Sequence, residues 1–114
     1  MAGLSLRIEI DPHGRIGPGK VALLERLDEL GSISAAGRSL GMSYKRAWAL
    51  IDDLNQCFGT PLVATQMGGR SGGGSALTPV GREVVAHYRA VETKAHKAAA
   101  KHLEALQAIA SHKD

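Results

Sequence analysis

The sequence has a single cysteine, Cys57. It has only four aromatic residues, which are Tyr44, Trp48, Phe58 and Tyr88. One cysteine excludes an intramolecular disulfide, which agrees with a reducing compartment. No apolar run reaches the length of a membrane span, and Arg7, Glu9 and Asp11 interrupt the N-terminus before a signal-peptide core can form. We therefore expect a cytoplasmic protein with no membrane partner, whose core is built from aliphatic side chains.

Acidic residues are absent from two stretches in the middle of the chain. Residues 31–50 contain Arg38, Lys45 and Arg46 but no acid, and residues 55–81 contain Arg70 and again no acid. The formal net charge of the whole chain is +3. The distribution of charge therefore predicts a positive face in the middle of the chain that suits phosphate groups.

The 114 residues have room for one domain. Apolar residues occupy every second position of residues 4–10, LSLRIEI, which predicts a strand with one buried face. Residues 11–18 are rich in Gly and Pro and predict a loop. Helical spacing then predicts helices over residues 19–30, 35–40 and 44–57, so that three helices fill residues 19–58.

Helix-capping residues separate these three helices. Gly31 and Gly41 predict the ends of the first and second helices. Either Ser32 or Ser34 can cap the second helix, and Ser43 can cap the third. The predicted buried positions of the third helix are Ala47, Leu50, Ile51, Leu54 and Phe58.

Two short β-type runs flank a glycine-rich segment and predict a hairpin over residues 62–78. Thr78 and Pro79 then begin a helix that is predicted to extend over residues 79–111. Such a long helix cannot bury its whole length against a body of about 80 residues, so we expect it to pair with a second copy. The residues expected at that dimer contact are Val84, Tyr88, Val91, Ala95, Leu103 and Leu106. The alternative is an alanine-rich tail that frays.

The second and third predicted helices, joined by a tight turn, indicate a helix-turn-helix. In this motif the N-terminal residues of the third helix lie in the major groove of DNA. Free backbone N–H groups at Ser43 favour a phosphate, and Lys45 and Arg46 suit guanine edges or phosphates. Tyr44 suits a thymine methyl group or a phosphate. Trp48 either contacts DNA or packs between the third helix and the hairpin.

The glycine-rich tip of the hairpin predicts the wing of a winged helix-turn-helix. Glycine permits a close approach of the backbone to a ligand, and Arg70 suits a minor groove. The residues expected at the DNA are Gly69, Arg70, Ser71 and Gly72. The alternative is a simple flexible connector. A P-loop is excluded, because a strand and not a helix follows the glycines and the Lys of a P-loop is missing.

No catalytic or metal-binding pattern is present. The histidines lack HExxH spacing, and one cysteine cannot form a CxxC pair. We therefore expect no enzyme activity, no metal site and no cofactor.

Two longer stretches carry a family resemblance. Residues 31–63 read GSISAAGRSLGMSYKRAWALIDDLNQCFGTPLV, and residues 68–84 read GGRSGGGSALTPVGREV. Over residues 4–92 the chain resembles the N-terminal DNA-binding domain of the ModE family of molybdate-responsive transcription regulators. The helix-turn-helix itself is also similar to that of LysR-type regulators. The resemblance implies a winged-helix dimer on pseudo-palindromic operators, with residues 43–46 at the DNA and the glycine-rich wing nearby.

Full-length members of the ModE family also carry C-terminal β-barrel domains that bind molybdate, and residues 1–114 contain no match to them. The resemblance therefore does not carry molybdate binding over to this chain, and molybdate remains unsupported as a ligand.

The sequence thus predicts a mainly α fold with a small β part, namely a single winged helix-turn-helix domain over residues 1–114 with a long C-terminal dimerisation helix. The expected function is a homodimeric, sequence-specific regulator of transcription that binds double-stranded DNA at the bacterial nucleoid, with a link to molybdate metabolism. The alternative is an oxyanion sensor or store that binds molybdate through the Gly-rich loop or the dimer interface.

Overall fold

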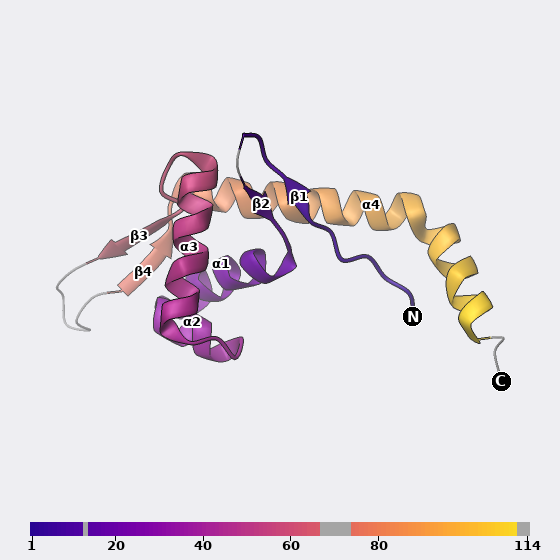
Figure 1. Ribbon diagram of the computed structural model, residues 1–114, viewed down its shortest axis with the longest axis horizontal. Helices are drawn as coiled ribbons and strands as arrows, with labels where there is room; N and C mark the ends of the chain where they lie inside the picture. Colours follow the sequence, from indigo (N-terminus) through magenta and orange to yellow (C-terminus); the bar gives the residue numbers. More distant parts are fainter. Residues whose placement is uncertain (13, 67–73, 112–114) are drawn as a thin grey trace.

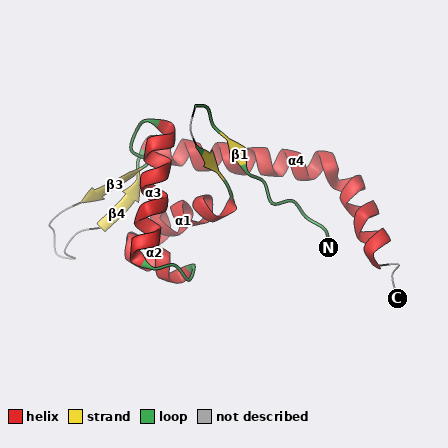
Figure 2. Cartoon of the chain, in the orientation of Figure 1, coloured by secondary structure: helices red, strands yellow, loops and turns green. Residues whose placement is uncertain are grey.

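A computed structural model describes residues 1–12, 14–66 and 74–111 of the chain. The elements along the chain are β1 (Ile8–Glu9), β2 (Arg15–Ile16), α1 (Pro18–Leu30), α2 (Ile33–Ser39), α3 (Tyr44–Phe58), β3 (Val63–Gln66), β4 (Gly74–Leu77) and α4 (Pro79–Ser111). Figure 1 shows α1, α2 and α3 gathered in one body, with the β3–β4 hairpin projecting from one side and α4 extending beyond the other. Figure 2 shows how little of the molecule is strand. The predicted mainly α winged fold is confirmed.

Leucine side chains of α1 form the centre of the core. Val21, Leu23, Leu24 and Leu27 are all buried, and they pack with buried residues of α2, α3 and the hairpin. Because Pro18 has no N–H to lose, it is tolerated at the start of α1. Gly31 ends α1 in the left-handed region with φ of 70°.

A few single residues explain the tight turn between α2 and α3. Ser32, rather than Ser34, caps α2 by accepting a hydrogen bond from the backbone N–H of Ala35 at 3.1 Å. Gly41 takes a φ of +72° in the turn. A Cβ atom on Gly37 would lie 3.1 Å from that of Ala47, so the two helices cross closely. This close crossing fixes the angle at which α3 leaves the body.

The N-terminal strand is shorter than the sequence predicts. The expected alternation of burial holds throughout residues 4–10, where even-numbered residues are half-buried and odd-numbered residues are exposed. Only Ile8 and Glu9 pair, however, and their antiparallel partners are Ile16 and Arg15. Residues 15–16 were expected to be loop. The partner strand is short because the glycines and proline that surround it turn the chain into α1.

The β3–β4 hairpin is joined to α4 by a junction formed by residues 77–81, LTPVG, which we call the LTPVG motif. Thr78 caps α4 by accepting a hydrogen bond from the N–H of Gly81 at 3.0 Å, and its hydroxyl donates to the carbonyl of Pro61. The N–H of Thr78 also donates to the carbonyl of Leu62. Any Cβ on Gly81 would overlap that same Leu62 carbonyl. The motif therefore holds the first turn of α4 directly against the hairpin.

The fourth helix, α4, has the predicted bounds, and only its first part packs on the body (Figure 1). Gly81 and Tyr88 are its buried residues. The Tyr88 hydroxyl donates to the carbonyl of Leu6 at 2.7 Å, which ties α4 to the N-terminal segment. Within the described part of the chain, no helix is long and apolar enough to cross a membrane.

Candidate nucleic-acid interface

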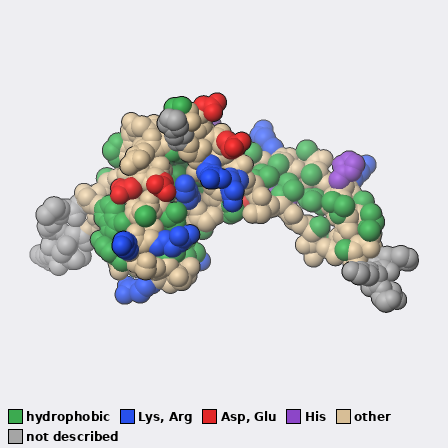
Figure 3. Space-filling model, in the orientation of Figure 1, with side chains coloured by type: hydrophobic (Ala, Val, Ile, Leu, Met, Phe, Trp, Pro, Cys, Tyr) green, Lys and Arg blue, Asp and Glu red, His purple; other side chains and the backbone are tan. Residues whose placement is uncertain are grey.

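The predicted DNA-contacting residues of α3 lie at an exposed helix N-terminus. The Ser43 hydroxyl caps the helix by accepting a hydrogen bond from the N–H of Arg46 at 3.1 Å. Tyr44 is 57% exposed, and Lys45 and Arg46 are also exposed. Neither cation forms a salt bridge within the described residues. Figure 3 shows Lys and Arg side chains gathered on the face of the molecule that carries α3.

The remaining positions of α3 explain why this end faces outward. Ala47, Ile51 and Leu54 are buried as predicted, whereas Leu50 and Phe58 are only half-buried. The same helix carries Asp52 and Asp53, which are exposed on its later turns. These carboxylates would repel phosphates, so the charge of α3 favours DNA at its N-terminal half.

The structure shows packing for Trp48, whereas its contact with DNA stays a prediction. Its side chain is half-buried and packs against the core. Its ring also contacts that of Tyr44 in an edge-to-face arrangement, with ring centroids 6.2 Å apart. Trp48 therefore supports the exposed Tyr44 from below.

The predicted contacts of the wing tip fall on Gly69, Arg70, Ser71 and Gly72, which lie outside the described residues. The stem of the wing is described: β3 and β4 pair antiparallel in a register that places Val63 opposite Leu77 and Gln66 opposite Gly74. This stem agrees with the predicted hairpin.

The residues expected at the dimer contact fall into three groups. Tyr88 is only 2% exposed and belongs to the core of its own chain, so it has no surface to offer a partner. Leu103 lines a hollow with Met1 and Ala2 of its own N-terminus. The other four, Val84, Val91, Ala95 and Leu106, are half-buried or exposed.

An ion-paired cluster joins α1 to α4 behind the candidate interface. Arg89 donates to both carboxylate oxygens of Glu25, with an Nε–Oε2 distance of 3.0 Å, and also to Glu92 at 2.7 Å. The hydrogen bonds from Arg89 lower the pKa of Glu25 despite the opposing effect of burial. The two carboxylates in turn raise the pKa of Arg89. This cluster is structural, since it lies between two helices and away from the head of α3.

A cationic hollow beside α3 was not predicted from the sequence. Arg7, Arg15 and Lys20 line it together with Arg46 of α3. The first three are scattered over the strand and loop segments and the start of α1, and no spacing rule connects them. The only sequence signal was that no acid occurs between residues 12 and 24.

No group of three or more His, Cys, Asp or Glu side chains that could hold a metal occurs among the residues that the structure describes. The chain is also similar to known proteins. A model of bacterial regulatory helix-turn-helix proteins of the lysR family matches residues 19–82, from the second residue of α1 to the first turn of α4. The chain belongs to this family.

Two curated relatives extend the lysR-family match. The molybdenum-pterin-binding protein MopB of Rhodobacter capsulatus is 45% identical over 78 residues, which are 68% of this chain and 29% of that protein. The DNA-binding transcriptional dual regulator ModE of Escherichia coli K12 is 38% identical over 71 residues, which are 62% of this chain and 27% of that protein. The expected resemblance to ModE proteins is confirmed, and the chain spans less than a third of the length of these relatives.

One solved structure shows the same lysR-type fold. The CbnR DNA-binding domain in its complex with DNA superposes with a TM-score of 0.59 at 19% identity, over 77% of this chain and 95% of that chain. At this identity the likeness concerns the fold alone. It confirms the winged helix-turn-helix arrangement that the sequence predicts.

Proposed function

We propose that this chain binds double-stranded DNA as a homodimer and regulates transcription from a pseudo-palindromic operator. The observation that carries the proposal is the head of α3, where Ser43 caps an exposed helix end that presents Tyr44, Lys45 and Arg46. This helix N-terminus has no acidic residue in its first turn, and its two cations form no salt bridge within the described residues, so it suits the phosphates and base edges of a major groove. Membership of a family of bacterial helix-turn-helix regulators supports the same reading.

The homodimer rests on the geometry of α4. Its 33 residues extend about 50 Å at 1.5 Å per residue, which is well beyond the body of the molecule. In a two-fold symmetric dimer, two copies of α3 would read half-sites that are about 34 Å apart, one turn of DNA. Arg70 and the glycines beside it would then contribute the wing, as the sequence predicts.

We propose genes of molybdate metabolism as the targets, because relatives of this chain are named for molybdenum-pterin binding and for molybdenum transport. The experiment that tests the proposal is selection of bound DNA from a random pool, with and without molybdate. A two-fold symmetric consensus supports a dimeric operator-binding protein. Tight molybdate binding without any enriched DNA would instead favour the oxyanion sensor.

The role of the α3 head is tested on the selected operator. Lys45→Ala with Arg46→Ala should weaken binding at least tenfold, because a lost contact to a base edge costs about 1–3 kcal/mol. Lys97→Ala with Lys101→Ala removes the same charge from exposed positions on the distant part of α4 and serves as the matched control. If the two double variants bind the operator equally well, the assignment of α3 as the reading helix is wrong.

A further inference from the structure

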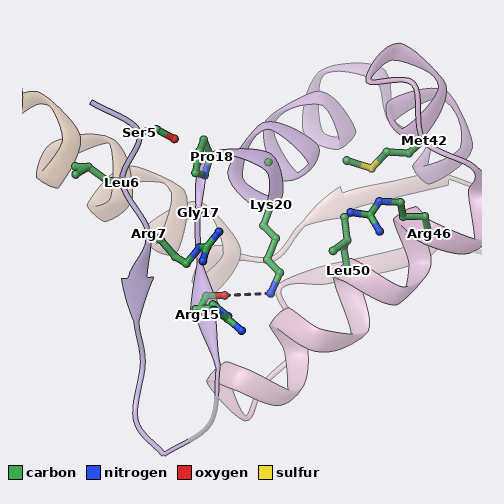
Figure 4. Close-up of a pocket in the computed structure, with 11 residues that line it drawn as sticks. Ser5, Leu6, Arg7, Arg15, Gly17, Pro18, Lys20, Met42, Arg46 and Leu50 are labelled. Atoms are coloured by element: carbon green, nitrogen blue, oxygen red, sulfur yellow. Dashed lines mark hydrogen bonds between the residues drawn. The ribbon is translucent and has the colours of Figure 1, made fainter. Parts of the chain in front are cut away.

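The cationic hollow beside α3 is an open cavity of about 750 Å³. We call it the N-terminal cleft. One wall consists of residues 5–7, Arg15 and the first turn of α1, and the other consists of Met42, Arg46 and Leu50. In Figure 4, Arg7, Arg15 and Lys20 lie on the first wall and Arg46 reaches toward them from α3.

The charge of the N-terminal cleft is of one sign. Its lining includes Arg7, Arg15, Lys20 and Arg46 and no acidic residue. Lys20 donates to the backbone carbonyl of Arg15 at 3.1 Å (Figure 4), and none of the four forms a salt bridge within the described residues. By contrast, Arg82 and Arg89 elsewhere are paired with carboxylates. Four unpaired cations around one hollow repel each other and favour an anion between them.

The backbone at the N-terminal cleft adds to its positive electrostatic potential. The first turn of α1 carries no acid, and its N-cap Gly17 provides no side-chain cap for the helix N–H groups. Gly17, Pro18 and Gly19 all line the cleft. A Cβ on Gly19 would meet nothing within 4 Å, so the approach to the helix end is open. The positive end of the α1 dipole therefore points into the cluster of cations.

Size and position identify the class of anion. The cavity of about 750 Å³ is far larger than one inorganic phosphate needs. It also shares Arg46 with the head of α3, so a strand of DNA backbone that leaves the major groove at α3 would run over it. The family match begins at residue 19, so the segment with Arg7 and Arg15 lies outside the matched helix-turn-helix.

We propose that the N-terminal cleft binds the phosphate backbone of DNA next to the half-site that α3 reads. This inference rests on the proposed DNA-binding function and adds a second, sequence-independent contact to it. Arg7, Arg15 and Lys20 supply the cations, and the start of α1 supplies backbone donors. Asp53 borders a neighbouring hollow with Arg15 and Lys20, and it limits the positive surface on that side.

The test measures how the affinity for the selected operator depends on salt. The variant is Arg7→Gln, Arg15→Gln and Lys20→Gln together, which keeps most of each side-chain stem. Each lost phosphate contact should reduce the slope of log K against log salt by about 0.9. The triple variant should therefore have a slope smaller by roughly 2–3 on a duplex with one helical turn of flanking DNA on each side. On a duplex trimmed to the half-sites, it should match the wild type.

Two further variants separate charge from folding. Arg7→Lys, Arg15→Lys and Lys20→Arg together keep the charge and should restore most of the slope. Lys94→Ala, Lys97→Ala and Lys101→Ala together remove three exposed charges of α4 and should leave the slope unchanged. Melting temperatures measured by circular dichroism check that each variant is folded.

Each outcome decides the matter. A wild-type protein that binds no DNA overturns the proposed function and this inference together. A wild-type protein that binds DNA, with a Gln variant of equal slope on the long duplex, overturns this inference alone. Calorimetry with inorganic phosphate tests whether the cleft is a site for small anions. That reading replaces this inference if free phosphate binding depends on Arg7, Arg15 and Lys20 while the salt dependence of DNA binding does not.

Discussion

At the scale of single residues, the structure separates cations that hold the fold together from cations that are free for a partner. Arg89 is fully engaged with Glu25 and Glu92. Lys45 and Arg46 are exposed and have no carboxylate partner in the described part of the chain. The sequence predicted the second group from the position of the helix-turn-helix, but it gave no sign of the first, because residues 25 and 89 are far apart in the chain.

The Glu25–Arg89 pair makes a prediction about pH. Because the folded-state pKa of Glu25 is lowered from 4.5, its contribution to stability is present above pH 4.5 and is lost as the pH falls through the lower folded value. Glu25→Gln should therefore reduce the free energy of unfolding by roughly 0.5–1 kcal/mol at pH 7, since the pair is partly exposed. Urea unfolding at pH 7 and pH 3 should show the difference from the wild type shrinking at the lower pH.

A matched control for this measurement is Glu29→Gln. Glu29 pairs with Arg26 at 3.7 Å, and both side chains are about half exposed or more, at 49% for Arg26 and 62% for Glu29. Such a pair contributes little. Equal effects of the two substitutions at both pH values would contradict the role given to Arg89.

At the scale of elements, local signals predicted the helices well and the pairing of strands less well. The bounds of α4 follow from Thr78 and Pro79 at its start and from the lack of a strong breaker afterwards. The first strand was predicted over seven residues, but the number of paired residues depends on its partner, Arg15–Ile16, which no periodicity marks. Tyr88 was assigned to a dimer contact because periodicity identifies an apolar stripe but does not tell which chain covers it.

The junction between the hairpin and α4 makes a prediction about stability. Gly81→Ala places a Cβ against the carbonyl of Leu62, so the helix must shift away from the hairpin. Overpacking of this kind costs about 1–3 kcal/mol. Gly19→Ala is the matched control, because a Cβ there meets nothing within 4 Å in α1 and alanine favours the helix. Thermal unfolding should show a lower melting temperature for the first variant and an equal or higher one for the second; the reverse order would refute the close approach.

At the scale of the whole molecule, the far part of α4 is the feature that one copy leaves unexplained. The principal-axis extents are 58 × 32 × 20 Å, and α4 extends beyond the body formed by α1, α2 and α3 (Figure 1). Beyond its first turn, the exposed large hydrophobic residues of α4 are Val91 at 45%, Leu106 at 61% and Ile109 at 71%. At 100° per residue these three lie within about 60° around the helix axis. A stripe of this kind on a protruding helix is typical of a contact between two helices.

The first two residues of the same chain lie beside the far part of α4 next to this stripe. Leu103, which lines the hollow with Met1 and Ala2, lies about 120° from Val91 and about 60° from Leu106 around the axis. Ile109 was not among the predicted contact residues, and its exposure adds it to the stripe. The stripe of Val91, Leu106 and Ile109 is therefore exposed in one copy, with Leu103 at its border.

The proposed dimer predicts what happens when this stripe becomes charged. Leu106→Asp with Ile109→Asp removes exposed apolar surface, so the fold of one copy should be unaffected while sedimentation shows the mass of a monomer. Ala86→Asp is a control on an exposed position of α4 that is turned about 140° from Val91, and it should remain a dimer. Binding to the full palindrome should fall by about 10²-fold in the double variant, because the two half-sites lose their linkage, whereas binding to one half-site should be equal in all three proteins. The proposed dimer is wrong if the wild-type protein sediments as a monomer at the concentrations at which it binds the palindrome. In that case α4 is a solvated tail, and the stripe takes no part in operator binding.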